Sequence, residues 1–308
     1  MLFQEYFNKY LEFISAKLKP QSIKSIKTRY FGYIYPYFKD LDINNITELV
    51  YLKWQNQLNN NNFKYAYKKS LHYTMVAFYN YLDLFYNYNR NIPKRVGNFS
   101  NNDLPTDISI LNIEEFNTFI KFFVDTDFVY KVLFIFLFNT GCRIGECLAL
   151  TFNDLNNDVV YINKTISKEK YNGVKMITTP KSRSSIRYIK IDNYLLSLIM
   201  QLKKYYSINN KEFNNNFYIF GGKKSLSITT IKRIQKKYCD ISNVKQIRLH
   251  DFRHSHATFL IKNNIPIIEV SRRLGHSDIN ITIKTYSHLA NEYEKKVVQT
   301  FNSFYKNL

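Results

Sequence analysis

The sequence predicts a mainly helical protein of two domains, with a small antiparallel sheet in the second. Three observations carry this prediction. The chain has 308 residues, a length that as a prior corresponds to about two domains. Apolar residues recur at helical intervals through most of the chain. In its second half, three short β-branched stretches separated by polar turns interrupt the helical pattern.

Residues 1–95 are predicted to form one domain of helices separated by polar breaks. The stretch "SIKSIKTRYFGYIYPYFKDL" has apolar residues at helical intervals and places Lys24, Lys27 and Arg29 on another face. The stretch "ITELVYLKWQNQL" begins at Thr47, whose hydroxyl is a good N-cap. A long amphipathic segment, "KYAYKKSLHYTMVAFYNYLDLFY", follows.

A linker and a second domain are predicted after these helices. Residues 89–109 are rich in Pro, Gly, Asn, Asp and Ser, so we place a linker at residues 96–109 and the second domain at residues 110–308. Asn112 and Glu115 have capping-box spacing, which predicts a helix from there. A buried helix through "YKVLFIFLF" should then end at a glycine break, Gly141.

The three β-like stretches of the second domain are "DVVYINKTI", "VKMITTP" and "SIRYIKI". Because they are short, β-branched and separated by polar turns, they predict one small antiparallel sheet. The helical pattern resumes at Tyr194 and continues to the end of the chain.

The chain carries a large excess of basic side chains, with 44 Lys and Arg against 24 Asp and Glu. The first hundred residues hold 14 basic and 6 acidic side chains, so the excess is present in both predicted domains. This distribution indicates a protein that binds a polyanion from more than one side. An AT-rich genome is an alternative source of the lysines, but it does not account for the shortage of acids.

We expect a cytoplasmic protein that makes no membrane contact. Cys142, Cys147 and Cys239 form no CxxC pair, which indicates a reduced protein without a zinc ribbon. The N-terminus lacks the apolar region of a signal peptide. The longest apolar run, "VLFIFLF", is far shorter than the roughly 20 residues that span a bilayer.

The stretch "RLHDFRHSHATFL", residues 248–260, concentrates histidines and arginines. His250, Asp251 and His254 have the spacing of a zinc-protease helix, but Arg253 lies on the same face and would repel a divalent ion. A phosphate clamp of His250 and Arg253 fits better, because arginine gives phosphate bidentate donors and histidine exchanges protons near neutral pH. A surface helix with incidental histidines is the third alternative.

Such a clamp needs further cations and a nucleophile. Arg143 follows a glycine break in "TGCRIGECLAL", Lys181 lies in the turn between the second and third β stretches, and His276 follows a glycine in "RRLGHSDINITIKTYSHL". Tyr286 lies ten residues after His276. Taken singly, these residues have simpler interpretations, as a surface arginine, a solvated lysine and one tyrosine among 26.

Taken together, these segments resemble the tyrosine recombinase (phage integrase) family. The shared order is an arginine in T-G-x-R-x-x-E, a lysine in a β-turn, H-x-x-R, L-G-H and then a tyrosine. The resemblance covers roughly residues 110–290, and the N-terminal region looks like the family's core-binding domain. It implies a mainly α protein with a helical core-binding domain and an α+β catalytic domain. The ten-residue interval is closer to phage and mobile-element integrases than to the Xer branch.

The resemblance implies a role for each matching residue. The implied catalytic set is Arg143, Lys181, His250, Arg253, His276 and Tyr286, with Glu146 supporting the Arg143 segment. Tyr286 would attack a scissile DNA phosphate and form a 3′-phosphotyrosine. The two arginines and His276 would hold the non-bridging oxygens, and Lys181 would protonate the departing 5′ oxygen. His250 would assist proton transfer at the phosphate or the tyrosine.

Some of these assignments have alternatives. Lys175 or Arg183 could take the place of Lys181, and Tyr293 is a second choice of nucleophile. The remaining histidines of the stretch, His254 and His256, are expected to be structural. The resemblance implies no metal ion, no cofactor and no ATP. It leaves a type IB topoisomerase-like enzyme, an inactive relative that only binds DNA, and a zinc hydrolase as other hypotheses.

The implied partner is double-stranded DNA, bound by both domains. Basic side chains outside the catalytic set would follow the DNA backbone, although each alone is as easily explained by solvation. They are Lys24, Lys27, Lys68, Lys69, Arg183, Lys232, Arg233, Lys236, Lys237 and Arg248.

The C-terminal segment places Val297, Phe301, Phe304 and Leu308 on one helical stripe. The stripe either packs on its own core or docks into the next protomer, a head-to-tail contact that can close a ring. The resemblance implies a homotetramer on two DNA sites that is a monomer or weak oligomer when free. We also expect the chain to lack the arm-binding module of the larger integrases.

Overall fold

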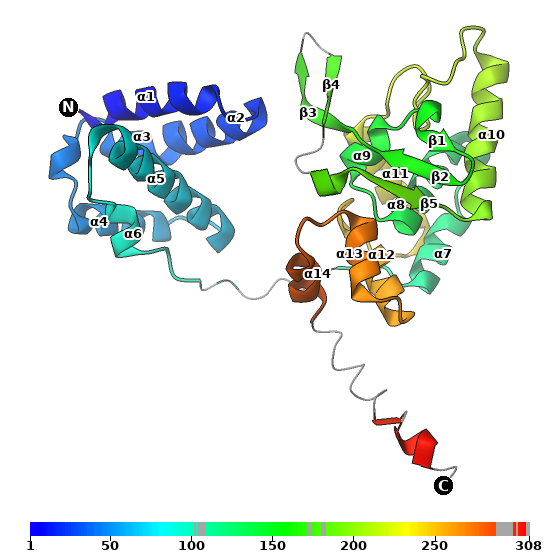
Figure 1. The fold of residues 1–308 in the computed structure, drawn as a ribbon. Coiled ribbons are helices and arrows are strands. Elements are labelled where there is room, and N and C mark those ends of the chain that lie inside the picture. The colour runs from blue at the N-terminus through cyan, green and yellow to red at the C-terminus, as the bar shows by residue number, and fades with distance from the viewer. Residues whose placement is uncertain are drawn as a thin grey trace. The chain divides into compact units, whose positions relative to one another are not determined.

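A computed structural model describes residues 1–101, 103, 109–171, 174–179, 183–287, 298–299 and 301–305 (Figure 1). Its contacts divide the chain into two compact units, residues 1–106 and 107–308, each with its own buried core. The helices of the first unit are α1 (Phe3–Ser15), α2 (Pro20–Arg29), α3 (Tyr35–Phe38), α4 (Glu48–Asn59), α5 (Tyr65–Tyr86) and α6 (Ile92–Val96).

The segment predicted as helical around residues 22–41 is divided by a π-helical turn, Tyr30–Ile34. Proline has no backbone N–H, so Pro36 cannot donate the hydrogen bond that a continuous α-helix needs. The chain instead closes a wider turn, in which the Tyr35 N–H bonds to the Tyr30 carbonyl. Helices α2 and α3 are therefore separate elements.

Aromatic side chains fill the core of the N-terminal unit. The rings of Phe7 and Tyr30 stack with their centroids 3.8 Å apart, and the indole N–H of Trp54 donates to the Tyr33 carbonyl at 2.9 Å. The predicted N-cap is confirmed, because the Thr47 side chain accepts from the Val50 N–H at the start of α4. Ile92 and Phe99 are also buried in this core, so the packing of the unit continues beyond residue 95.

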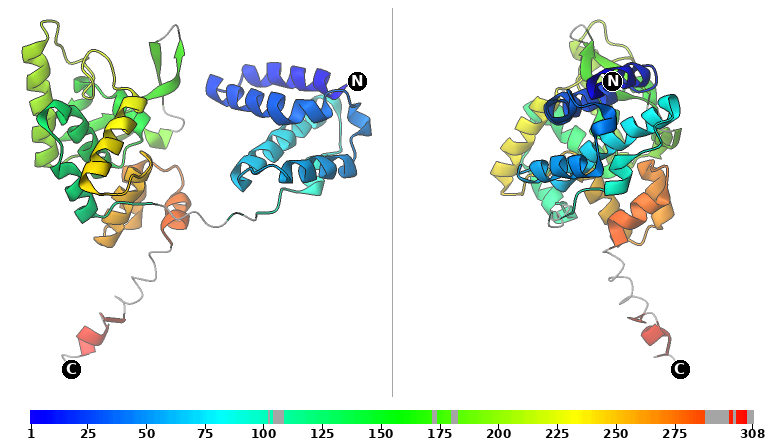
Figure 2. Two further views of the ribbon diagram at one scale, coloured as in Figure 1. Left: turned by 180° about the vertical axis from the view of Figure 1, so that it is seen from behind. Right: turned by 90° about the vertical axis from the view of Figure 1, so that its left-hand side faces the viewer.

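The second unit contains helices on both sides of short strands, and its elements are α7 (Ile113–Lys121), α8 (Phe128–Thr140), α9 (Ile144–Ala149), β1 (Leu155–Asn156), β2 (Val159–Ile162), β3 (Thr165–Tyr171), β4 (Val174–Thr178), β5 (Arg187–Lys190), α10 (Asn193–Asn209), α11 (Ile228–Ser242), α12 (Asp251–Lys262), α13 (Ile267–Leu274) and α14 (Ile279–Tyr286). Figure 2 shows α11 on the face turned away from the viewer in Figure 1. No helix among the described residues is long and apolar enough to cross a bilayer.

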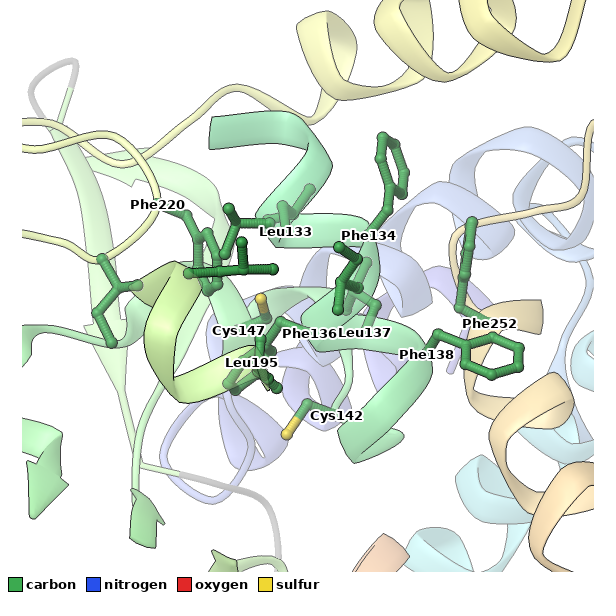
Figure 3. Close-up of a cluster of buried hydrophobic side chains, with 14 of the residues drawn as sticks. Leu133, Phe134, Phe136, Leu137, Phe138, Cys142, Cys147, Leu195, Phe220 and Phe252 are labelled. Carbon is green, nitrogen blue, oxygen red and sulfur yellow. The ribbon is translucent and has the colours of Figure 1, made fainter. Parts of the chain in front are cut away.

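Helix α8 lies at the centre of this unit. Its residues 132–138 are all buried, which confirms the prediction from the "YKVLFIFLF" run. Figure 3 shows its side chains among those of neighbouring elements, with Phe220 on one side and Phe252 of α12 on the other. The capping box predicted at the start of α7 is also present, since Asn112 and Glu115 exchange side-chain-to-backbone hydrogen bonds.

The prediction of one antiparallel sheet is wrong, because the β stretches form two. Strands β1, β2 and β5 make one sheet in that order, and β3 and β4 form a separate hairpin. The stretch "DVVYINKTI" leaves the first sheet near Lys164, whose ammonium pairs with the buried carboxylate of Asp154 at 2.7 Å. Strand β5 then returns to pair with β2 and not with β4.

The helical pattern predicted from residue 194 onward is also interrupted. Helix α10 ends at Asn209, and α11 begins at Ile228. Between them Gly221 and Gly222 have φ values of +129° and +72°, which are incompatible with a right-handed helix. Tyr218 in this segment makes an isolated bridge to Thr151.

Gly141 ends α8 in the left-handed conformation with φ +64°, as its position in the sequence predicted. A Cβ at this position would lie 2.5 Å from Cδ2 of His256 and 2.8 Å from Cδ2 of Leu274. His256 is itself fixed, since its Nδ1–H donates to the Phe138 carbonyl at 2.8 Å. The space beside Gly141 is therefore already filled by side chains that have little freedom to move.

We predict that Gly141→Ala lowers the free energy of unfolding of the second unit by roughly 2–5 kcal/mol, from left-handed strain and overpacking together. Urea unfolding followed by circular dichroism would measure the change. Gly32→Ala is the matched control, because a Cβ at Gly32 would meet nothing within 4 Å. Equal stability of the Gly141 and Gly32 variants would contradict the prediction.

Candidate active site

The chain turns sharply between α8 and α9, and arginines from later elements hold this turn. The Gly141 carbonyl accepts from Nη1 of Arg253 on α12 at 2.9 Å, and the Asn139 carbonyl accepts from Nη2 of Arg273 on α13 at 3.0 Å. The last carbonyls of a helix lack intrahelical partners, so these donors satisfy groups that would otherwise be buried without one. Arg143 follows directly after the turn.

Arg143 lies at the N-cap of α9 and is 39% exposed. Its Nη1 donates to Oε1 of Glu146 at 2.7 Å, while Oε2 of Glu146 accepts from the Arg143 backbone N–H at 3.1 Å. Glu146 is buried, and burial by itself would raise the pKa of its carboxyl group. The guanidinium groups of Arg187 and Arg143 outweigh burial, so the pKa is lowered and the carboxylate stays charged.

Arg187 on β5 is a part of this cluster that the sequence prediction missed. Its Nη2 donates to Oε2 of Glu146 at 3.0 Å, and its Nε donates to the Arg273 carbonyl at 2.8 Å. The side chain is buried, in phase with Ile189 and Ile191 along the strand. An arginine at an inward-facing strand position is unusual. Its alternation with Ile189 in "SIRYIKI" was the sequence signal that could have identified Arg187 as a buried residue.

Among the predicted catalytic cations that the structure describes, Arg253 is the most buried, at 3% exposure. Its Nη1 is bound to the Gly141 carbonyl, but its Nη2 is buried with no partner among the described residues. Burial, with the nearby charges of Arg143 and Arg187, lowers the pKa of Arg253 to about 9. A buried guanidinium with a free donor and cationic neighbours is suited to bind an anion.

His276 follows Gly275, which ends α13 at φ +73°. Its Nδ1 lies 2.7 Å from Oγ1 of Thr282, a contact that orients the ring. Burial and the charges of Arg253 and Arg143 lower the pKa of His276 to about 4. These electrostatic effects place His276 in the same field as the two arginines.

Tyr286 is the last residue of α14 and is 4% exposed. Burial raises the pKa of its phenol to about 12, with a smaller opposing effect from Arg253. Its hydroxyl lies 2.9 Å from Nδ1 of His254 on α12. His254 was expected to be structural, so this contact is a second feature that the sequence prediction missed.

His250 lies at the N-terminal end of α12 and is exposed. Its ring meets the ring of His254 edge to face, with centroids 5.2 Å apart. Burial of part of the ring, followed by the charges of His254, Arg253 and Arg143, lowers the pKa of His250. The structure therefore brings five of the six predicted catalytic residues into one electrostatically coupled group.

The sixth predicted residue, Lys181, lies outside the described residues, as does the alternative nucleophile Tyr293. The alternatives Lys175 and Arg183 fall on described backbone, but their side chains are not described. The geometry of the site is thus given by the residues that come from α9, α12, α13 and α14.

Most of the predicted DNA-backbone residues that the structure describes lie on helix surfaces, Arg248 precedes α12, and some have protein partners. Lys237 pairs with Asp127 at 2.8 Å, and Arg248 pairs with Asp251 at 2.8 Å while remaining 76% exposed. Lys68 donates to Oδ1 of Asn59. The others are Lys24 and Lys27 on α2, Lys69 on α5, and Lys232, Arg233 and Lys236 on α11, all of them exposed.

Asp251, the acidic residue in the spacing that resembles a zinc-protease helix, has an arginine partner. Asp251 is buried and both of its carboxylate oxygens accept from Arg248. Within the described part of the chain, no group of three or more His, Cys, Asp or Glu side chains could hold a metal ion. The three cysteines are buried free thiols.

The second unit thus combines a buried tyrosine, a cluster of arginines and histidines, and helices with two small sheets. The chain belongs to the phage integrase family, whose model matches residues 110–293. A second model, for the N-terminal SAM-like domain of phage integrases, matches residues 2–59.

The curated relatives include integrases and tyrosine recombinases. The chain is 34% identical over 192 residues to the ICEBs1 integrase of Bacillus subtilis (strain 168), an alignment that covers 60% of this chain and 51% of that protein. The chain thus spans about half the length of this curated relative.

Solved structures share the fold of the chain. The Tn1549 transposon integrase in complex with transposon right end DNA matches with a TM-score of 0.79 at 17% identity, over 97% of this chain and 100% of that one. A lambda integrase tetramer bound to a Holliday junction matches with a TM-score of 0.65 at 14% identity, over 90% of this chain and 78% of that one.

We predict that Arg187→Met destabilises the second unit by roughly 3–5 kcal/mol, because it leaves the buried Glu146 carboxylate with one partner fewer. Lys190→Met is the matched control on the same strand, since Lys190 pairs with Asp158 but is 76% exposed. That variant should lose less than about 1 kcal/mol. Urea unfolding of both variants measures the difference, and similar losses would contradict a buried role for Arg187.

Acid should destabilise the protein through His256. Burial lowers the pKa of His256 to about 3, so the unfolded chain takes up its proton first as the pH falls. The free energy of unfolding is unaffected by this proton uptake above pH ~6.5. As the pH falls from there toward 3, it decreases by up to about 1.4 kcal/mol per pH unit. Urea unfolding at several pH values should therefore give a shallower slope for His256→Asn, and an unchanged slope would count against this source.

Proposed function

We propose that the protein is a site-specific DNA recombinase that cuts and rejoins duplex DNA through a 3′-phosphotyrosine intermediate. The observation that supports this best is a buried phenol, Tyr286, in the field of Arg253, whose Nη2 has no partner among the described residues. A phosphodiester bound there would supply the missing anion. The Tyr286 phenol would then be the nucleophile that attacks its phosphorus atom.

In the proposed reaction, the Tyr286 oxygen attacks the scissile phosphorus and the 5′ oxygen of the next nucleotide departs. Negative charge grows on the non-bridging oxygens in the transition state, and Arg143, Arg253 and His276 would stabilise it. We assign protonation of the 5′ oxygen to Lys181. The covalent intermediate conserves the energy of the broken bond, so a second DNA end can reverse the step without ATP.

Glu146 and Arg187 would act through their neighbours. Glu146 holds the Arg143 guanidinium at 2.7 Å, and Arg187 holds Glu146 at 3.0 Å. Because this carboxylate has two cationic partners, it would restrain Arg143 without cancelling its charge. The reaction we propose draws its charge stabilisation from these side chains and calls for no metal ion or cofactor.

We propose that both domains bind double-stranded DNA, with residues 1–95 as the core-binding domain, 96–109 as the linker and 110–308 as the catalytic domain. Exposed lysines on α2, α5 and α11 would neutralise phosphates and make binding strongly salt-dependent. A cytoplasmic location fits a DNA substrate and the reduced cysteines.

The active assembly is proposed to be a homotetramer on two DNA sites, formed from monomers or weak oligomers. Val298, Phe301, Phe304 and Tyr305 near the C-terminus are exposed apolar side chains. A groove of the catalytic unit is lined by apolar side chains, among them Phe138, Ile191, Phe259, Leu260 and Ile265. We assign the C-terminal segment of a neighbouring copy to this groove, and the lambda integrase tetramer is a precedent for the assembly.

We predict that Tyr286→Phe binds DNA normally but forms no covalent adduct. The substrate is a nicked suicide duplex that carries the junction sequence found beside the gene, and the adduct is detected by denaturing electrophoresis. Tyr293→Phe is the control and should form the adduct at the parental rate. Adduct formation should also continue in EDTA.

Three results would count against the proposal. An undiminished adduct in Tyr286→Phe would move the nucleophile to another tyrosine. Relaxation of plasmids that lack the junction sequence would favour a topoisomerase-like activity. Loss of the adduct in EDTA would indicate a metal-dependent reaction.

A further inference from the structure

The hydroxyl of the proposed nucleophile is held by a histidine that the proposed reaction does not yet use. Nδ1 of His254 lies 2.9 Å from the hydroxyl oxygen of Tyr286, with the ring centroids 6.0 Å apart. The two residues come from different helices, α12 and α14, so tertiary packing creates the contact. Tyr286 is almost fully buried, which keeps bulk water from serving as the proton acceptor.

We propose that His254 accepts the phenolic proton of Tyr286 as the tyrosine oxygen attacks the scissile phosphate. This inference rests on the proposed function and names the base of that reaction. The resemblance assigned proton transfer at the tyrosine or phosphate to His250. The geometry favours His254 at the tyrosine, because its ring nitrogen is within hydrogen-bond distance of the reacting oxygen.

A base is needed because the phenol ionises poorly where it lies. Burial raises the pKa of Tyr286 to about 12, so the phenolate fraction at pH 7 is on the order of 10⁻⁵. Removing the proton while the oxygen–phosphorus bond forms avoids that unfavourable equilibrium. A neighbouring nitrogen at 2.9 Å is placed for such a concerted transfer.

His254 is suited to accept a proton at neutral pH. Partial burial lowers the pKa of its imidazole, Arg253 and Arg248 act in the same direction, and Asp251 opposes them. The ring is therefore neutral at pH 7, and Nδ1 accepts when Nε2 carries the hydrogen. The titratable and charged groups that face His254 are Arg248, His250, Asp251 and Arg253 from its own segment, Tyr286 from α14 and His276 after α13.

The proposed step balances in protons and charge. The phenolic O–H bond breaks and its proton moves to Nδ1 of His254. The Tyr286 oxygen forms a bond to phosphorus, and the bond from phosphorus to the 5′ oxygen breaks. The 5′ oxygen takes a proton from the proposed acid, Lys181. In the rejoining step, imidazolium His254 returns a proton to the departing tyrosine oxygen.

The test is the rate of adduct formation by His254→Gln on the suicide duplex, measured from pH 5 to pH 9. Glutamine can still accept a hydrogen bond from the phenol but cannot carry its proton away. We expect the rate at pH 7 to fall by roughly 10²–10⁴-fold while DNA affinity is retained. The parental rate should be level above pH ~7 and fall in acid, where His254 is protonated. The variant's rate should instead rise about tenfold per pH unit, because phenolate must then form by simple ionisation.

The chain offers a matched control for a purely structural role. Nδ1 of His72 lies 3.0 Å from the Tyr51 hydroxyl in the N-terminal core, a buried histidine–tyrosine contact of the same kind. His72→Gln should alter stability but leave the shape of the pH–rate profile unchanged. A His254→Gln profile parallel to the parental one would reduce His254 to a structural residue and overturn the inference.

A substrate with sulfur in place of the bridging 5′ oxygen distinguishes the loss of the base from the loss of the acid. A thiolate leaves without protonation, so this substrate should restore activity to a variant that lacks the acid. It should not restore activity to His254→Gln, and rescue of that variant would contradict the assignment.

If the parental protein forms no adduct, or Tyr286→Phe still does, the proposed function itself fails. A loss in Tyr286→Phe with parental kinetics in His254→Gln overturns only the present inference.

Discussion

The end of helix α8 is a constraint on which the second unit, residues 107–308, depends. The last carbonyls of this helix are buried, so they must be satisfied by protein donors. The donors are the side chains of His256, Arg273 and Arg253. These hydrogen bonds therefore hold α12 and α13 against α8. One of the donors, Arg253, is also an arginine proposed for catalysis. Gly141 permits the approach, because a side chain there would collide with His256.

The same arrangement sets the electrostatics of the proposed site. The charges of Arg143 and Arg187 both act on Arg253. The same two arginines share the Glu146 carboxylate as an ion-pair partner. The pKa of Arg253 and that of His276 are both lowered by burial and by these like charges. A cluster of this composition is poorly balanced by the protein alone, which fits a site whose substrate is an anion.

Much of the fold and the order of the site residues could be predicted from the sequence. The caps at Thr47 and Asn112 and the break at Gly141 depend on local chemistry, and the structure contains all three. The division into two sheets depends on which strands pair, because β5 pairs with β2 and not with β4, and no local pattern encodes that choice. The roles of Arg187 and His254 depend on which elements pack together, and their partners lie 41 and 32 residues away.

The excess of cations at the site has a thermodynamic consequence. Repulsion among the arginines of the site is a cost to the folded state, and a bound phosphate would offset it. Any ligand that binds the folded state alone raises its population by mass action. DNA would then act as a folding ligand as well as a substrate, and the catalytic unit would be at its most ordered when a phosphodiester is in place.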